Sequence, residues 1–320
     1  MRFGIGLPMN AGSLESMIEY ACVAEALGFD SVVTADHVSI TYEALTLLAA
    51  LAMKTQSIRV GTLVLDGNRR DPAILAHTTA TLDRVSGGRL ILGVGKGVFN
   101  EASYGVAVEK PVSRMLEVIK VLKKLWTQDA VNHAGEFFTY NNLRLASKPL
   151  QKPHPPLWVA AFGRRMQRIA AEVGDGFITQ NMPPRLFKKC LGRVQAAAVR
   201  AGRDPEKVEA VYGMMPVAVA KDRWAARKLV EASAKSFLLR HGRRISEDLG
   251  YEKPWSTLKE IPDAVVDECY VFGAPKECVK RVDKYIKAGA TYIIFQSVLP
   301  HGVDSLKALA EELFRKSNHP

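Results

Sequence analysis

Residues 58–97 read IRVGTLVLDGNRRDPAILAHTTATLDRVSGGRLILGVGKG, and this stretch decides the fold of the chain. The run 58–65 is apolar and rich in β-branched residues, which favours a buried strand. Pro72 stands where the first turn of a helix accepts proline, and the glycine pair at 87–88 ends that helix. Residues 89–94 then form a short apolar strand of the kind that is buried on both faces of a parallel sheet. The stretch therefore predicts one parallel β–α–β unit.

The same order of helix, glycine and strand recurs at residues 25–34, 171–179 and 286–295. In each copy the glycine is expected to adopt a left-handed conformation that ends the helix, and these glycines are Gly28, Gly174 and Gly289. Eight strands are predicted in total, at residues 3–7, 31–34, 59–64, 90–94, 157–160, 176–179, 210–219 and 292–296. Eight alternating units without a topological switch point predict a (β/α)8 TIM barrel. A doubly wound open sheet is the alternative, but no dinucleotide-binding fingerprint follows the first strand.

The length of 320 residues suits a single barrel domain over residues 1–320 with two insertions. The first insertion, 126–156, contains a predicted hairpin at 133–140. The second, 236–267, is polar with glycine and proline breaks, and we expect a loop there. Connections of this length are usually lids or binding loops, and packing on the outside of the barrel is the alternative.

The composition argues against several classes of protein. No apolar run approaches the roughly 18 residues of a membrane helix. The N-terminal sequence MRFGIGLP lacks the apolar core of a signal peptide, so we expect a cytoplasmic protein with no membrane part. The four cysteines are scattered, and none of the seven histidines is spaced with another ligand. We therefore expect neither a disulfide framework nor a metal site.

Lysine and arginine together exceed aspartate and glutamate by 11. The basic residues are dispersed over predicted helices, and the denser basic runs have no interleaved aromatic residues on which bases could stack. We therefore expect no nucleic-acid partner. Attraction to an acidic small molecule and a solvated surface with an arbitrary basic bias both remain open.

Asp36 and His37 follow the second predicted strand and are the only acid and imidazole that stand together at a strand C-terminus. Barrel enzymes carry their catalytic groups at this end of the strands. Histidine is the natural proton donor or acceptor near neutral pH, so the pair is a candidate catalytic site. The alternative is structural, with Asp36 capping a helix and His37 hydrogen-bonded at its start.

Two glycine-containing loops also follow predicted strands. Residues 160–165, AAFGRR, end one strand and open a helix, where backbone N–H groups near Gly163, joined by Arg164, can bind an anion. Residues 93–97, GVGKG, form a second loop, whose glycines would let a ligand come close to the backbone, and Lys96 lies inside it. Two such loops at one end of a barrel suggest a cofactor that carries phosphate. The segment SGGRL, residues 86–90, precedes a strand and is interpreted as structural.

Several motifs together resemble the luciferase-like flavin and deazaflavin oxidoreductases of the bacterial luciferase superfamily. They are GFDSVVTADH, the 58–97 block with TLDRVSGGR and LGVG, RMLEVIKVLKKLW, the KPxPP segment before the fifth barrel strand, and AEVGDGFIT. The likeness covers nearly the whole chain in order. Within that family it is strongest to the coenzyme F420-dependent branch that includes the methylenetetrahydromethanopterin reductases, and the C-terminal VFGAPKECVKRVDKYIKAGATYIIF shares it.

The resemblance implies a homodimeric barrel that binds F420 at the strand C-termini. Asp36 and His37 match the family's pair beside the deazaflavin ring, and Leu63 with Val64 falls where the family has a bulge with a non-prolyl cis peptide bond. The resemblance places further cofactor-binding residues in the two glycine loops, and these are Gly95, Lys96, Gly97, Asn100, Ala160, Ala161, Phe162, Gly163 and Arg164. An acidic cofactor tail would suit the basic surplus.

This chain also departs from the pattern of the methanopterin reductases. Gly6 and Val98 stand where those enzymes carry acidic residues, and Glu101 is a nearby acid that could substitute. The first hypothesis is an F420-dependent oxidoreductase that moves hydride to or from a small organic substrate, with 5,10-methylenetetrahydromethanopterin as one candidate. The alternatives are an FMN-dependent monooxygenase that uses dioxygen, a non-catalytic flavin-binding homologue, and a sugar-phosphate barrel enzyme without a redox cofactor.

Overall fold

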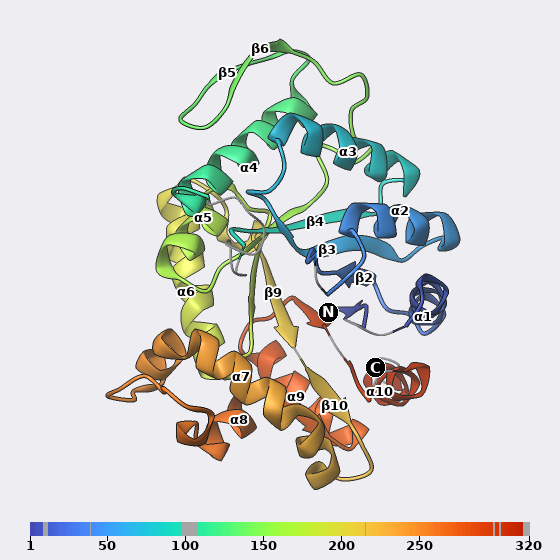
Figure 1. Cartoon of the computed structure of the whole chain (residues 1–320), viewed down its shortest axis with the longest axis vertical. Helices are drawn as coiled ribbons and strands as arrows, with labels where there is room; N and C mark the ends of the chain where they lie inside the picture. Colours follow the sequence, from blue (N-terminus) through green and yellow to red (C-terminus); the bar gives the residue numbers. More distant parts are fainter. Residues whose placement is uncertain are drawn as a thin grey trace. The chain divides into compact units, whose positions relative to one another are not determined.

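The computed structural model describes residues 1–8, 12–38, 40–97, 108–214, 216–296, 298–300 and 302–315, with the backbone alone at 241–244. Eight strands form a closed barrel in the order β1-β12-β9-β8-β7-β4-β3-β2 (Figure 1). These strands are β1 (Arg2–Gly6), β2 (Ser31–Thr34), β3 (Arg59–Asp66), β4 (Leu90–Gly95), β7 (Leu157–Ala160), β8 (Gly176–Gln180), β9 (Glu209–Met214) and β12 (Tyr292–Phe295). The prediction of a (β/α)8 barrel is confirmed.

Ten α-helices and two short 3₁₀ helices connect the strands of the described chain. The α-helices are α1 (Leu14–Ala26), α2 (Ala44–Lys54), α3 (Pro72–Val85), α4 (Pro111–Thr127), α5 (Arg164–Val173), α6 (Pro184–Arg200), α7 (Arg223–Leu249), α8 (Asp263–Cys269), α9 (Pro275–Lys287) and α10 (Val303–Arg315). The 3₁₀ helices are η2 (Pro205–Lys207) and η3 (Leu258–Glu260). No described helix has the length and apolar character that crossing a membrane requires.

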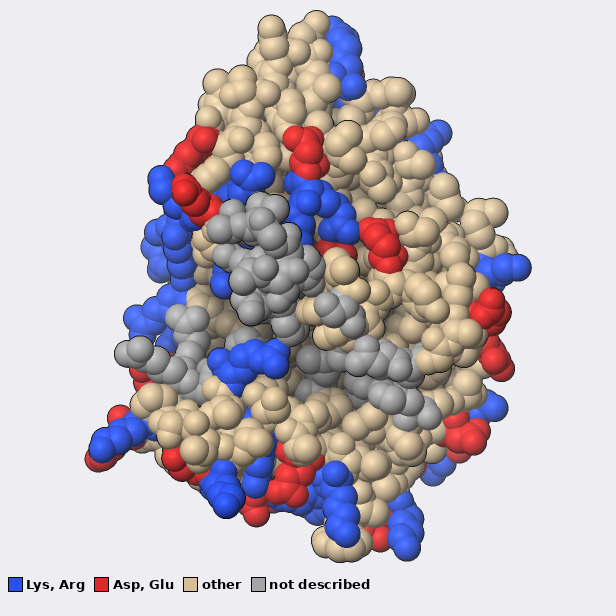
Figure 2. Space-filling view, in the orientation of Figure 1, with Lys and Arg blue, Asp and Glu red and all other residues tan. Residues whose placement is uncertain are grey.

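The chain divides into two compact units. Unit 1 comprises Met1–Phe29, Thr179–Arg193 and Glu209–Pro320, and unit 2 comprises Asp30–Ile178 and Val194–Val208. Figure 2 shows Lys and Arg side chains scattered over one face of the molecule, with Asp and Glu side chains between them.

Unit 2 contains the stretch that decided the fold. Strands β2, β3, β4 and β7 pair in parallel, and the pairing of β3 with β4 shifts register between Thr62 and Leu65. Leu92 and Trp158 on these strands are fully buried, as expected for strands covered on both faces. Helix α3 begins with Pro72 in its first turn, and the Asp71 carboxylate caps it by accepting from two backbone N–H groups. The predicted β–α–β unit is therefore confirmed.

In unit 1, β12 lies between β1 and β9 and pairs in parallel with both. A second, three-stranded sheet is formed by β10 (Val217–Val219), β11 (Val271–Gly273) and β13 (Val298–Leu299). The prediction of one continuous strand over 210–219 is wrong, because the chain leaves the barrel after β9 and enters this second sheet as β10. Pro216, which has no N–H to donate, lies between the two strands.

The expected loop at 236–267 is wrong at both ends, because α7 covers its start and α8 begins at Asp263. Helix α7 continues unbroken to Leu249 and ends at Gly250, whose φ of 89° is left-handed. The helix persists because its apolar face packs into a buried cluster that also includes α8 residues, and Val230, Leu238, Ile245 and Val266 belong to this cluster. Tertiary packing of an amphipathic face stabilises the helix against the polar, glycine-containing sequence.

Two of the three predicted helix-ending glycines are left-handed, Gly28 with φ 88° and Gly289 with φ 104°. The prediction for Gly174 is wrong, because its φ of −84° and ψ of 156° are extended. A Cβ atom at Gly174 would lie 2.7 Å from the carbonyl oxygen of Ala170 and 3.1 Å from a methyl of Val159. Gly174 is therefore needed for space rather than for handedness.

Arg89 secures the N-terminal side of β4. Its Nε donates to the carbonyl oxygen of Ser86, and its two terminal nitrogens donate to the carbonyl oxygens of Ala52, Thr55 and Ile58 at 2.6 to 3.1 Å. One guanidinium thus ties the end of α2 and the approach to β3 to the turn before β4. This supports the structural interpretation of the 86–90 segment.

The insertion at 126–156 carries the predicted hairpin as β5 (Val131–Ala134) and β6 (Thr139–Leu143), which pair antiparallel. The buried carboxylate of Glu117 on α4 accepts from the backbone N–H groups of Glu136, Phe137 and Phe138 in the hairpin turn, and it contacts Nε2 of His133 at 3.0 Å. Burial alone would raise the pKa of Glu117, but these contacts, that of His133 first, hold its pKa below the ordinary value. Glu117 therefore fastens the hairpin to α4.

Candidate active site

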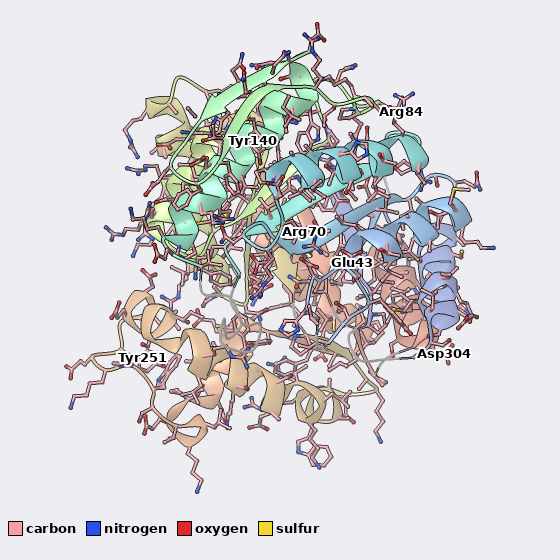
Figure 3. All side chains as sticks on the ribbon, turned by 45° about the horizontal axis from the view of Figure 1, so that its top comes forward. Glu43, Arg70, Arg84, Tyr140, Tyr251 and Asp304 are labelled. Atoms are coloured by element: carbon pink, nitrogen blue, oxygen red, sulfur yellow. The ribbon has the colours of Figure 1, made fainter. Side chains whose placement is uncertain are left out.

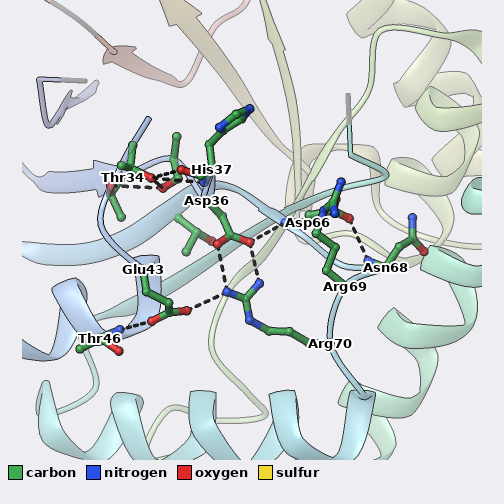
Figure 4. A network of polar contacts seen from close by, with 12 residues as sticks. Thr34, Asp36, His37, Glu43, Thr46, Asp66, Asn68, Arg69 and Arg70 are labelled. Atoms are coloured by element: carbon green, nitrogen blue, oxygen red, sulfur yellow. Dashed lines mark hydrogen bonds and ion pairs between the residues drawn. The ribbon is translucent and has the colours of Figure 1, made fainter. Parts of the chain in front are cut away.

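The carboxylate of Asp36 forms the centre of a polar network in unit 2. Asp36 lies two residues after β2, and Arg70 lies in the loop between β3 and α3. Two guanidinium nitrogens of Arg70 donate to the two carboxylate oxygens of Asp36 at 2.6 and 3.0 Å (Figure 4). Only about a tenth of the Asp36 side chain is exposed, so this bidentate ion pair is largely shielded from water.

Arg70 also binds Glu43, which caps the N-terminus of α2. Its Nη2 lies 2.7 Å from Oε1 of Glu43, and the other Glu43 oxygen accepts from the N–H of Thr46 at 2.7 Å. Figure 3 shows Glu43 and Arg70 beside each other. Burial alone would raise the pKa of Glu43, but the contacts with Thr46 and Arg70 outweigh it and hold the pKa below the ordinary value. Burial opposes the charge of Arg70, yet Asp36 and Glu43 raise the pKa of Arg70 above its ordinary value.

Asp36 also reaches the end of β3. Its Oδ2 accepts from the backbone N–H of Asp66 at 3.1 Å. Asp66 follows the register shift in β3, and within that shift the peptide bond between Leu63 and Val64 is cis. The bulge and the cis bond that the resemblance implied are therefore present. Through Asp36 and Arg70, the bulged end of β3 is fastened to the loop after β2.

Asp36 and His37 point in opposite directions. In Figure 4 the Asp36 carboxylate faces Arg70, whereas the imidazole of His37 points away from the network. The backbone of His37 is held in a turn, because its N–H donates to the hydroxyl of Thr41 and its carbonyl accepts from the N–H groups of Ile40 and Thr41. Although Asp36 and His37 are adjacent in sequence, their side chains thus lie in different surroundings.

Gly95 ends β4 against the bulge of β3. A Cβ atom at Gly95 would lie 2.7 Å from a methyl of Val64 and 3.6 Å from the Cβ of Ala160. Glycine at 95 therefore lets the Val64 side chain and the end of β7 approach the end of β4.

Gly97 is left-handed, with φ 78°, and a Cβ atom there would lie 2.5 Å from Oδ2 of Asp66. Asp66 in turn accepts from the N–H of Asn68 at 3.0 Å and from Nε of Arg69 at 2.6 Å. The Asn68 side chain donates to the carbonyl oxygens of Lys96 and Pro111. The loop after β4 is thereby packed on the loop after β3, with the side chain of Lys96 exposed.

Asn100, Glu101 and Val98 lie outside the described residues.

Helix α5 begins at Arg164, within the predicted AAFGRR segment, with Gly163 as its N-cap and no side-chain cap. Its first intrahelical hydrogen bond runs from the N–H of Gln167 to the carbonyl of Gly163, so the N–H groups before it point out of the helix end. Arg164 is exposed at this end, and Arg165 donates to the hydroxyl of Ser113 at 2.8 Å. Uncapped N–H groups, a positive helix end and arginine side chains together suit an anion such as phosphate.

Two hydrogen bonds hold the loop before α5. The N–H of Ala161 donates to the carbonyl of Ile178 on β8 at 2.8 Å, and the carbonyl of Phe162 accepts from the side chain of Gln167 at 3.2 Å. Ala160 ends β7, so the predicted residues 160–164 run from the C-terminal end of that strand into the first turn of α5.

Sequence reasoning placed Asp36, Leu63, Val64, Gly95, Gly97 and the 160–164 segment at strand ends, and the structure groups them within unit 2. It missed Arg70, Glu43 and Asp66. The available signal was the RRDP run, in which an arginine pair precedes a helix N-cap immediately after a strand.

Comparison with known proteins gives a consistent result. Residues 1–292 match the family described as luciferase-like monooxygenase. The chain is 29% identical to a 5,10-methylenetetrahydromethanopterin reductase from Archaeoglobus fulgidus, with 99% of each chain covered. It is 30% identical to an F420-dependent glucose-6-phosphate dehydrogenase from Amycolatopsis mediterranei, with 87% of each covered. The fold matches that of a coenzyme F420-dependent tetrahydromethanopterin reductase from Methanopyrus kandleri with a TM-score of 0.83, at 22% identity and with 98% of this chain and 99% of that one covered.

Proposed function

Because the chain belongs to the luciferase-like monooxygenase family, we propose that it is the F420-dependent kind of oxidoreductase, which transfers hydride between the deazaflavin and a small organic substrate. Relatives similar over most of the chain are F420-dependent by name or act on a methanopterin. The observation that carries the proposal is that unit 2 holds two features together. The N-terminus of α5 at Gly163 has no side-chain cap, and Gly95, having no Cβ atom, leaves room for Val64 in the bulge of β3. The first suits a phosphate group and the second a flat ring.

The residues present fit such a cofactor. The N–H groups at the start of α5, with Arg164, would hold its phosphate, and Lys96 and Arg164 offer exposed positive charge to an acidic tail. Val64 and Gly95 would present an apolar, closely packed surface to the ring. Held by these residues, the deazaflavin would supply the hydride-transfer chemistry.

The chain's own residues would then divide the remaining work. We assign proton donation or hydrogen bonding to His37, because Asp36 is committed to Arg70 and to the N–H of Asp66. Asp36 is a positioning residue that keeps the bulge of β3 in place. A methylene-pterin such as 5,10-methylenetetrahydromethanopterin is the first substrate to test, and we expect a cytoplasmic homodimer.

The test is a fluorescence titration of the purified protein with oxidised F420 and, separately, with FMN. Saturable F420 binding with weak FMN binding is expected. Arg164→Gln should weaken F420 binding about fivefold, as for an exposed charged contact of about 1 kcal/mol. Arg168→Gln is the matched control, since Arg168 lies one turn further along α5 and pairs with Glu172.

The reverse cofactor preference would instead support the alternative of an FMN-dependent monooxygenase, since the family is described as luciferase-like monooxygenase. Binding of neither cofactor would refute both proposals.

A further inference from the structure

In unit 1, glycines on both neighbouring strands leave the space that Gln296, the residue after β12, occupies. A Cβ atom at Gly6 of β1 would lie 2.7 Å from the Cα of Gln296 and would also overlap its carbonyl oxygen. A Cβ atom at Gly213 of β9 would overlap the side-chain Nε2 of Gln296. Both the backbone and the amide of Gln296 therefore occupy space that any other residue at 6 or 213 would fill.

The amide of Gln296 reaches across β9 to Gln180, the last residue of β8. Nε2 of Gln296 donates to Oε1 of Gln180 at 2.6 Å, and Gln296 is only 9% exposed. The Cβ of Gln180 lies 3.3 Å from the position of a Cβ at Gly213, so the bridge passes directly over that glycine. One hydrogen bond thus joins two amides at the C-terminal ends of β8 and β12, the ends where barrels bind their ligands.

The bridge uses half of each amide. Within the described part of the chain, Oε1 of Gln296 and Nε2 of Gln180 make no hydrogen bond, and neither atom is buried out of reach of solvent. The pair therefore presents one acceptor and one donor, and neither carries charge.

We propose that the Gln180–Gln296 pair recognises the lactam edge of a heterocyclic ligand, in which an N–H donates to Gln296 and the adjacent C=O accepts from Gln180. A lactam carries this donor and acceptor side by side and is neutral, as the pair is. Two sources have this chemistry, the pyrimidine ring of a deazaflavin or flavin cofactor and the ring of a pterin substrate. The assignment of these sources rests on the proposed function, whereas the recognition of a lactam does not.

The test measures direct binding of three probes to the full chain. The probes are F420, 6-methylpterin, and 2,4-diamino-6-methylpteridine, which has an amino group in place of the pterin's C=O. Binding of F420 and the pterin is followed by ligand fluorescence, and binding of the diamino compound by calorimetry. The wild type should prefer the pterin over the diamino compound by at least about tenfold, as expected for one mismatched hydrogen-bonding edge.

Three variants remove or move the amides. Gln180→Leu and Gln296→Leu delete one partner each, and Gly213→Ala keeps both amides but displaces that of Gln296, a flexible side-chain end. Gln195→Leu, an exposed amide on α6, is the matched control. Thermal unfolding establishes that each variant is folded, and Gly213→Ala serves where a leucine variant is not.

A loss of at least tenfold in pterin binding, with F420 binding unchanged, supports the proposal with the substrate as the source of the lactam. The same loss in F420 binding supports it with the cofactor as the source. Unchanged binding of both ligands in the folded variants, or a wild type that binds neither the pterin nor F420, overturns it. A wild type that binds the pterin in preference to the diamino compound, and loses that preference in Gly213→Ala, supports lactam recognition even where F420 fails to bind and the proposed function falls.

Discussion

The guanidinium of Arg70 and the carboxylate of Asp36 form two hydrogen bonds, 2.6 and 3.0 Å long, between loops 34 residues apart in the sequence. The fork of an arginine matches a carboxylate in this way, whereas a lysine does not. The remaining contact of Arg70, to Glu43, adds the start of α2 to the same point. The side chain of Arg70, in the loop after β3, therefore holds both ends of the loop between β2 and α2.

Replacement of Arg70 by lysine should be costly although the charge is kept. An ammonium group cannot form the two bonds to Asp36 and reach Glu43 at the same time, so we expect the free energy of unfolding to fall by about 1–2 kcal/mol. F420 binding should weaken as well, because the bulge of β3 loses its fastening. Urea denaturation and fluorescence titration measure the two effects. Arg168→Lys, on the exposed face of α5, should change neither.

His37→Asn should separate chemistry from binding. If His37 supplies the proton or hydrogen bond, kcat should fall about 100- to 10,000-fold in the variant. F420 should bind as it does to the wild type, because the Asp36–Arg70 network does not involve the imidazole. Steady-state kinetics with the substrate found by screening, together with the titration, gives both values. An unchanged kcat would contradict the assignment of His37.

Glycine substitutions in unit 1 should have opposite effects at two positions. Gly6→Ala places a methyl group against the backbone of Gln296, which cannot move freely, so stability should fall by about 1–3 kcal/mol. Gly192→Ala, in α6 where a Cβ atom would meet nothing within 4 Å, should raise stability by about 0.5–1 kcal/mol. Chemical denaturation of both variants checks the pair. A neutral Gly6→Ala would show that β12 can shift.

Glu117→Gln should loosen the hairpin, because an amide cannot accept from all the N–H groups that the carboxylate binds. We expect a loss of about 1–3 kcal/mol at neutral pH. The pKa of Glu117 is held below its ordinary value of 4.5, so the contribution is fully present above that pH and is lost as the pH falls through the lowered folded-state pKa. Unfolding measured from pH 7 to pH 3 should therefore show a smaller acid-induced loss in the variant. Glu172→Gln, at an exposed ion pair, is the control.

Local sequence signals were sufficient to predict the elements whose ends are marked by their own capping residues, prolines and glycines. Pro72, the Asp71 cap and the left-handed Gly87 and Gly88 define α3 within the chain itself, and the bounds predicted for β2 and β7 are those observed. Such elements depend on propensities and capping, which act over a few residues. The helix α7 could not be predicted in this way, because its stability comes from packing against α8 and the second sheet.

The candidate site was predictable in its main-chain positions but not in its contacts. Glycines and strand ends located residues 95–97 and 160–164, and the family resemblance located residues 63–64. The partnership of Asp36 with Arg70 depends on which loops a closed barrel brings together, and that is a long-range property. The basic run at 69–70 was visible in the sequence only as charge. The same reason hid the bridge between Gln180 and Gln296, residues 116 positions apart.

The contacts of Arg89 explain why the motif around it identifies the fold of the chain and not its activity. Four of its acceptors are main-chain oxygens, which every amino acid supplies, so its clamp places little demand on the identity of its neighbours. The side chains around Arg89 can therefore be substituted without loss of these four hydrogen bonds, whereas the arginine and the turn that it holds cannot. The most recognisable motifs of such a sequence then indicate a shared fold. They say little about the activity of any one member. Divergence in activity has to be sought at the other end of the strands.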